Sequence, residues 1–207
     1  FHELFVCELA SNHWGDVNRG LDIIRKFAAV AGECEVRAAI KLQFRDVDTF
    51  VHPAWRHRTD IRYINKTLAT RMPWENYGVL CRAIRDTGCL VAATPFDEVS
   101  VAKCVEFGVD IIKIASSDLT AWRIIDAIIQ TEKPILASTG GASLDHVDTL
   151  VSAVRSPLAL NHCVSIYPSR DDELCLNQID VLRRRYPNHT IGFSTHECSD
   201  WSSSMLL

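Results

Sequence analysis

Short apolar runs alternate along the chain with longer segments of mixed polarity. Strands buried on both faces show such continuous apolar runs, because covering layers meet the side chains on each side of the sheet. The pattern predicts seven parallel strands: Leu4–Leu9, Ala38–Gln43, Cys89–Thr94, Asp110–Ala115, Pro134–Ser138, Ala159–Val164 and Thr190–Ser194.

The segments between these runs carry apolar residues at the spacing of an amphipathic helix. In the first of them, Leu21, Ile24 and Phe27 share one helical face. Gly88 and Gly108 stand where two segments should end, since glycine readily adopts the left-handed conformation found at helix C-termini. Six helices are predicted: Val17–Ala31, Trp74–Thr87, Glu98–Phe107, Trp122–Thr131, Leu144–Val154 and Leu176–Tyr186.

This alternation is typical of a parallel sheet with right-handed crossovers. An open doubly wound sheet and a closed (βα)8 barrel both fit the order. No G-x-G-x-x-G pattern follows the first strand, which disfavours a dinucleotide-binding sheet. A barrel usually needs about 250 residues, so seven strands in 207 residues fit an α/β fold of the TIM-type barrel class, truncated after the seventh strand.

We therefore expect residues 1–207 to form a single (βα)-barrel catalytic domain that is incomplete at its C-terminal end. Trp201–Leu207 are predicted to begin a seventh helix. Arg45–Pro73 are expected to form a long loop, rich in Arg, His and Asp, that contributes to a lid. The chain does not begin with Met, so we expect it to come from a longer protein.

The composition and the net charge indicate which kinds of molecule the protein could bind. The chain is 47% hydrophobic and 23% charged, as ordinary soluble globular proteins are. Its net charge of −4 argues against a nucleic-acid or membrane partner, so a few placed cations must hold any anionic substrate. We expect a cytoplasmic protein, because neither a signal peptide nor a membrane span is recognisable. The eight cysteines form no C-x-x-C pair, which disfavours zinc and predicts small buried apolar side chains in a reducing compartment.

Polar side chains follow nearly every predicted strand. In (βα) barrels the active site lies at the carboxyl ends of the strands, so these residues are expected to converge on one face. Along the chain they are Glu8, Asn12, Lys41, Gln43, Thr94, Asp97, Lys113, Ser116, Asp118, Ser138, Gly140, Ser165, Tyr167, Ser194 and His196.

Each of these residues has a structural alternative when taken alone. Lys113 lies between isoleucines, where a lysine is costly unless it meets an anion or joins an ion pair. Ser138–Gly141 suit either a phosphate cradle or a simple turn. His196 suits either a metal ligand or a hydrogen-bonded buried histidine. Taken together, the two lysines, Lys41 and Lys113, and several hydroxyls favour a site for a small, doubly anionic ligand. Glu8 and Asp118 are candidates for proton transfer.

Seven short blocks of the sequence, in this order, resemble the N-acetylneuraminate (sialic acid) synthase family, which includes legionaminic and pseudaminic acid synthases. No single block carries the resemblance; the ordered set does. The blocks are Glu8–Asp16, Lys41–Gln43, Thr94–Asp97, Lys113–Thr120, Ser138–Gly140, His162–Pro168 and Ile191–Glu197.

The resemblance implies condensation of phosphoenolpyruvate with an N-acetylated hexosamine, giving a nine-carbon 2-keto sugar acid and phosphate. It makes Glu8 the acid/base group near the sugar aldehyde and places Asp118 beside the cationic centre formed from phosphoenolpyruvate. Gln43 and Tyr167 would contact the sugar. The implied phosphoenolpyruvate contacts are Lys41, Lys113, Ser116, Ser138, Ser165 and Ser194.

The resemblance also implies a divalent metal, typically Mn²⁺, with His196 as one of two histidine ligands and the second beyond residue 207. The sugar-capping domain typical of the family is not expected within this chain, and full-length members are often homodimers. Ser165 stands where many members carry Asn, and Ser117 where many carry Gly. These departures bear on which amino sugar is used more than on the reaction type.

Two other functions stay open at the level of sequence. One is another phosphoenolpyruvate-dependent synthase, which makes a 3-deoxy sugar acid from a phosphorylated aldose and would use Arg45, Arg56 and Arg58 for the second phosphate. The other is a non-catalytic, truncated barrel that serves as a binding module. The buried charges predicted at strand ends favour an enzyme, since a non-catalytic chain has no physical need for them.

Overall fold

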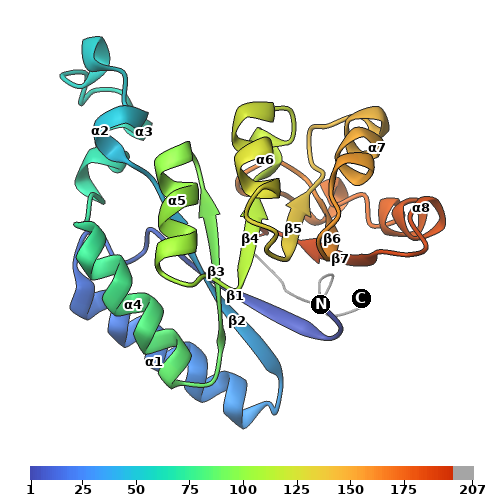
Figure 1. Ribbon diagram of the computed structural model, residues 1–207, viewed down its shortest axis with the longest axis horizontal. Coiled ribbons are helices and arrows are strands. Elements are labelled where there is room, and N and C mark those ends of the chain that lie inside the picture. The colour runs from blue at the N-terminus through green and yellow to red at the C-terminus, as the bar shows by residue number, and fades with distance from the viewer. Residues whose placement is uncertain (198–207) are drawn as a thin grey trace. The chain divides into compact units, whose positions relative to one another are not determined.

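The computed structural model describes residues 1–197 and divides the chain into two compact units (Figure 1). The first unit comprises His2–Ile112, and the second begins at Lys113. The helix predicted to begin at Trp201 lies outside the described residues, as does Cys198. Within residues 1–197, no helix combines the length and the apolar character needed to span a membrane.

The first unit contains parallel strands that pair in chain order. Figure 1 shows α1 and α4 running side by side. The larger elements are β1 (Leu4–Ala10), α1 (Val17–Glu33), β2 (Arg37–Phe44), α4 (Trp74–Asp86), β3 (Leu90–Pro95), α5 (Glu98–Glu106) and the start of β4 (Ile111–Ile114).

The second unit continues the same alternation. Strand β5 pairs in parallel with β6, and β6 pairs with β7. Its elements after β4 are η2 (Ser116–Asp118), α6 (Trp122–Ile129), β5 (Ile135–Ser138), α7 (Leu144–Ala153), β6 (Leu158–Cys163), η3 (Asp171–Glu173), α8 (Gln178–Arg185) and β7 (Thr190–Ser194). All seven predicted strands and all six predicted helices are therefore confirmed, with bounds that shift by a few residues.

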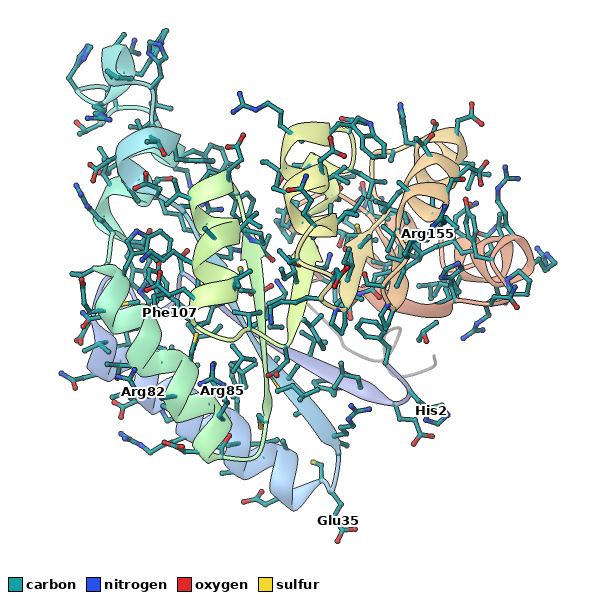
Figure 2. All side chains as sticks on the ribbon, viewed as in Figure 1. His2, Glu35, Arg82, Arg85, Phe107 and Arg155 are labelled. Carbon is teal, nitrogen blue, oxygen red and sulfur yellow. The ribbon has the colours of Figure 1, made fainter. Side chains whose placement is uncertain are left out.

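Local chemistry explains where the helices begin and end. The Asp16 carboxylate accepts a hydrogen bond from the Asn18 N–H at 2.8 Å and caps α1. Gly88 and Gly108 have φ values of +83° and +65°, which confirms their predicted place at helix ends. Arg85 of α4 lies against Phe107 (Figure 2) and donates to the carbonyl oxygens of Phe107 and Gly108, which satisfies acceptors at the end of α5.

The segment Arg45–Pro73 is not the plain loop that its polarity predicts. It contains three short helices: α2 (Val47–Phe50), η1 (Pro53–Trp55) and α3 (Arg62–Ala69). The His52 ring accepts from the Ala54 N–H at 3.2 Å, and Pro53 opens η1, where its missing N–H costs nothing. Helix α3 has no buried residue, although Ile64 and Leu68 lie on one helical face. Its role in a lid stays a prediction.

The cysteines follow the sequence prediction only in part. All seven described cysteines are free thiols. Cys81, Cys104 and Cys163 are buried, and burial raises the pKa of the Cys81 thiol to about 12. Cys34 and Cys175 are exposed, which corrects the expectation of burial at these two positions. They lie at a helix end and in a loop, outside the apolar strands on which the prediction rested.

An ion pair joins α7 to the end of α8 in the second unit. Asp148 accepts two hydrogen bonds from the Arg185 guanidinium and one, at 2.8 Å, from the Tyr186 hydroxyl. These donors, with Arg185 the larger cause, lower the pKa of the Asp148 carboxyl to about 2. A carboxyl whose pKa is lowered on folding stabilises the protein above its unfolded pKa of about 3.9, and this contribution is lost as the pH falls toward 2.

We expect Asp148→Asn to lower the unfolding temperature at pH 7, because the amide loses the ionic part of this contact. The difference from wild type should shrink as the pH falls from about 4 toward 2. Thermal unfolding across this pH range measures the effect, with Asp126→Asn on the exposed side of α6 as the matched control. A difference that stays constant with pH would contradict the assignment.

Candidate active site

In the first unit, a buried lysine meets acceptors at the carboxyl ends of β1 and β3. Lys41 of β2 is 9% exposed, and its Nζ donates to the Glu8 carboxylate and, at 3.3 Å, to the Thr94 hydroxyl. Strand register explains the pairing, because Glu8 lies directly beside Lys41 in the β1–β2 ladder. The buried ammonium is therefore satisfied by an ion pair and a hydroxyl, while Glu8 remains partly open to water.

Two residues beyond Lys41, the predicted sugar contact Gln43 has a side-chain partner. Its Oε1 accepts from the Arg45 guanidinium at 3.0 Å. The Arg45 guanidinium carbon lies 3.9 Å from the centre of the Phe96 ring, within the range of a cation–π contact. Gln43 is thus oriented by its own neighbour at the end of β2.

In the second unit, another buried lysine meets a buried hydroxyl. Lys113 of β4 is 6% exposed and Ser138 of β5 is 3% exposed. The Lys113 Nζ donates to the Ser138 Oγ and, at 3.2 Å, to the Ile114 carbonyl oxygen. The two residues are 25 positions apart in the sequence, and the structure brings them together. Both were predicted to contact the same anion.

The strand ends next to this pair approach each other closely. The Ser165 hydroxyl, two residues past β6, donates to the Ser116 hydroxyl at 2.8 Å. A Cβ atom on Gly140 would lie 2.6 Å from both the Cys163 Sγ and the Ser165 Oγ. Only glycine lets the backbone after β5 pass this close to the residues after β6. Small side chains and backbone N–H groups are the features that suit a phosphate cradle.

The remaining predicted residues of the second unit lie on the segments after β4, β6 and β7. Asp118 lies in η2, two residues past Ser116. The Tyr167 and His196 rings are 4.0 Å apart between centroids, and the His196 carbonyl oxygen accepts from the Ser169 N–H at 3.3 Å. Ser194 ends β7.

A metal centre is not complete within the described residues. Residues 1–197 contain no group of three or more His, Cys, Asp or Glu side chains that is arranged to hold a metal ion. Protein metal sites for divalent transition metals usually take at least three protein ligands, so His196 and its described neighbours do not fit a metal site by themselves.

Two features of the site went unrecognised in the sequence. The first is the direct Glu8–Lys41 pair, which a strand alignment would have found because the two residues are in register. The second is His162, a buried residue of β6 that contacts the Leu174 carbonyl oxygen. The two residues are 12 positions apart, with the end of β6, a loop and η3 between them, so no spacing rule points to the contact.

Comparison with known proteins agrees with this arrangement of strands and helices. The NeuB family model matches residues 28–204, which is most of the chain. The fold is that of a (βα) barrel, of which this chain provides seven parallel strands. The chain therefore belongs to the NeuB family.

Particular relatives extend the comparison. A crystal structure assigned to spore coat polysaccharide biosynthesis protein E from Chromobacterium violaceum is 36% identical, with a TM-score of 0.95, and the match covers 99% of this chain and 62% of that one. A sialic acid synthetase structure from Leptospira borgpetersenii is 28% identical, with a TM-score of 0.81, over 94% of this chain and 65% of that one. The Homo sapiens N-acetylneuraminate-9-phosphate synthase is 24% identical over 95% of this chain and 56% of its own length. The chain thus spans about half the length of the curated relatives that it matches.

Proposed function

We propose that the protein condenses phosphoenolpyruvate with an N-acetylated hexosamine, giving a nine-carbon 2-keto sugar acid and phosphate. The observation that carries the proposal is the buried Lys113–Ser138 pair at the strand ends of the second unit. Relatives named as N-acetylneuraminate-9-phosphate, legionaminic acid and pseudaminic acid synthases support this reaction type.

Phosphoenolpyruvate carries two anionic groups on three carbon atoms and needs donors placed close together. In the proposal, Lys113 supplies a fixed positive charge, and the Ser138, Ser116 and Ser165 hydroxyls supply neutral donors beside it. Donors held in place before the substrate arrives cost little reorganisation during the reaction, which makes their electrostatic effect large. Ser194 at the end of β7 completes the proposed set in this unit.

The proposed reaction first joins the two substrates and then releases phosphate. The enol carbon of phosphoenolpyruvate forms a bond to the sugar aldehyde carbon, and the aldehyde oxygen takes a proton. Water then adds to the carbon that bears the phosphate and gives up one proton, which balances the proton taken by the aldehyde oxygen. The C–O bond to phosphate breaks, the new hydroxyl gives its proton to the departing phosphate, and a ketone remains. We assign Glu8 to proton transfer at the aldehyde oxygen and Asp118 to stabilising the cationic carbon and orienting the water. Lys41, which holds Glu8 in place, is assigned to the phosphoenolpyruvate anion as well.

The sugar contacts are proposed for Gln43 and Tyr167. The Gln43 amide is oriented by Arg45 and presents polar atoms suited to hydroxyl and acetamido groups. Tyr167 is 64% exposed and offers an aromatic face and a hydroxyl. A divalent metal, Mn²⁺, is part of the proposal because of the family resemblance, with His196 as one ligand and the others from outside the described residues.

The test is phosphate release from phosphoenolpyruvate by the longest natural form of the protein. Free and 6-phosphorylated N-acetylmannosamine, the corresponding glucosamine derivatives and a phosphorylated aldose without an acetamido group are supplied separately, with Mn²⁺ or with a chelator. We expect phosphate release that requires an N-acetylated hexosamine and that stops when the chelator removes Mn²⁺. Release with the plain phosphorylated aldose alone would indicate a 3-deoxy sugar acid synthase, and a folded protein that releases no phosphate with any sugar would indicate a binding module.

A further inference from the structure

His162 is a buried residue of β6 that is not assigned to either substrate. Its neighbour Asn161 points the other way, because successive side chains of a strand face opposite sides. The Asn161 Oδ1 lies 2.5 Å from where a Cβ on Gly192 would be, and its backbone carbonyl accepts from the Thr139 N–H at 2.9 Å. The Asn161 side chain thus faces Gly192, whereas the His162 ring contacts Phe193 and the Leu174 carbonyl oxygen.

The buried His162 ring is fixed by two contacts. Its side chain lies parallel to the ring of Phe193, its register partner in β7, with a centroid distance of 5.9 Å and an interplanar angle of 17°. The His162 Nε2 lies 2.7 Å from the carbonyl oxygen of Leu174, which is 1% exposed. A carbonyl oxygen only accepts hydrogen bonds, so the His162 Nε2 carries the proton and donates it.

This hydrogen bond closes the segment between β6 and α8, residues 164–177. Three hydrogen bonds attach the segment, from Ser165 to Ser116, from Ser169 to His196 and from His162 to Leu174, and the Tyr167 ring contacts the His196 ring. The Leu174 carbonyl oxygen accepts a buried hydrogen bond from His162, a side chain of β6. The chain therefore comes back to β6 before α8 begins. A loop whose far end is fixed samples fewer conformations, which favours one placement of the residues between its ends.

We propose that His162 is a positioning residue for substrate binding, acting through the 164–177 segment on Ser165 and Tyr167. The effect on catalysis rests on the proposed function, because Ser165 is assigned to phosphoenolpyruvate and Tyr167 to the sugar. The effect on the segment itself does not depend on any assigned activity. The two parts can therefore be tested separately.

His162→Phe keeps an aromatic ring that can stack on Phe193 but removes the donor to Leu174. We expect faster amide hydrogen exchange in residues 164–177 and an increase of about fivefold in KM for phosphoenolpyruvate, the usual effect of losing one hydrogen bond. His162→Gln, whose amide can donate to the same carbonyl, should restore much of the protection and of the KM. A purely structural role would lower the unfolding temperature of both variants without this pattern in KM.

His189→Phe is the matched control, because the His189 Nδ1 makes a similar contact, 3.3 Å, with the Leu158 carbonyl oxygen at the start of β6. It should leave KM and the exchange of residues 164–177 unchanged. A folded His162→Phe protein with wild-type exchange in that segment would overturn the proposal. Faster exchange with an unchanged KM would overturn its catalytic part, and absence of any synthase activity in the wild type would overturn the proposed function while the exchange result still stands.

Discussion

Lys113→Met is expected to reduce phosphate release by about 10- to 100-fold, because one buried charge–anion contact contributes about 1.5–3 kcal/mol and this one is placed in advance. Methionine matches the length of the lysine side chain but carries no charge. The change also removes the donor of two buried acceptors, the Ser138 hydroxyl and the Ile114 carbonyl oxygen, which costs stability. The unfolding temperature should therefore fall as well, so the activity is measured at a temperature at which the variant stays folded.

The control for this prediction is Lys26→Met, which removes an exposed lysine from α1. Steady-state kinetics and thermal unfolding of both variants, measured side by side, separate catalysis from folding. We expect Lys26→Met to behave as wild type in both measurements. Retention of more than a tenth of the wild-type kcat/KM by Lys113→Met would show that Lys113 is structural and does not bind the substrate anion.

Gly140→Ala is expected to abolish most activity and to destabilise the fold by about 1–3 kcal/mol, the usual cost of inserting a methyl group where there is no room. Its Cβ would lie 2.6 Å from the Ser165 Oγ and 2.7 Å from the Cys163 carbonyl oxygen. The carbonyl belongs to β6 and cannot move without disturbing the β6–β7 ladder. The phosphate cradle proposed around Ser165 should therefore be displaced.

Two further variants show whether the clash has the stated cause. Gly140→Ala combined with Cys163→Ala removes the thiol contact but keeps the carbonyl contact, so it should not restore activity. Gly32→Ala adds a methyl group where no atom lies within 4 Å, in helix α1. It should be neutral or stabilise the protein by up to about 1 kcal/mol, because alanine favours helix more than glycine does. Chemical unfolding and phosphate release measure both effects, and wild-type activity in Gly140→Ala would contradict the account.

Much of the fold could be predicted from the sequence because a buried parallel strand appears as a continuous run of apolar residues. Ile111–Ile114 are apolar except for Lys113, and the structure buries all four. The segment Arg45–Pro73 could not be predicted in the same way. Its short helices bury little apolar surface, and local contacts such as the His52 cap hold them instead. Such contacts have no periodicity that a sequence pattern could reveal.

Some residues of the candidate site could likewise be predicted from the sequence, and others could not. Lys113 and Ser138 could be predicted because each ends a strand, and neighbouring parallel strands bring their carboxyl ends together. The contact between Glu8 and Lys41 needs the register of β1 on β2, which composition does not specify. His162 was missed because its partner is a backbone carbonyl at the end of an irregular segment. Backbone acceptors look the same at every position of a sequence, so only the folded chain shows which one is used.

The central claim is that the three carbons of phosphoenolpyruvate are joined to an amino sugar. The most direct measurement is a mass spectrum of the product made from phosphoenolpyruvate labelled with ¹³C at all three carbons and the sugar that supports the fastest phosphate release. The account predicts a 2-keto sugar acid that contains all three labelled carbons together with the intact N-acetylated hexosamine. Labelled pyruvate beside an unchanged sugar would show simple hydrolysis of phosphoenolpyruvate and would contradict the account.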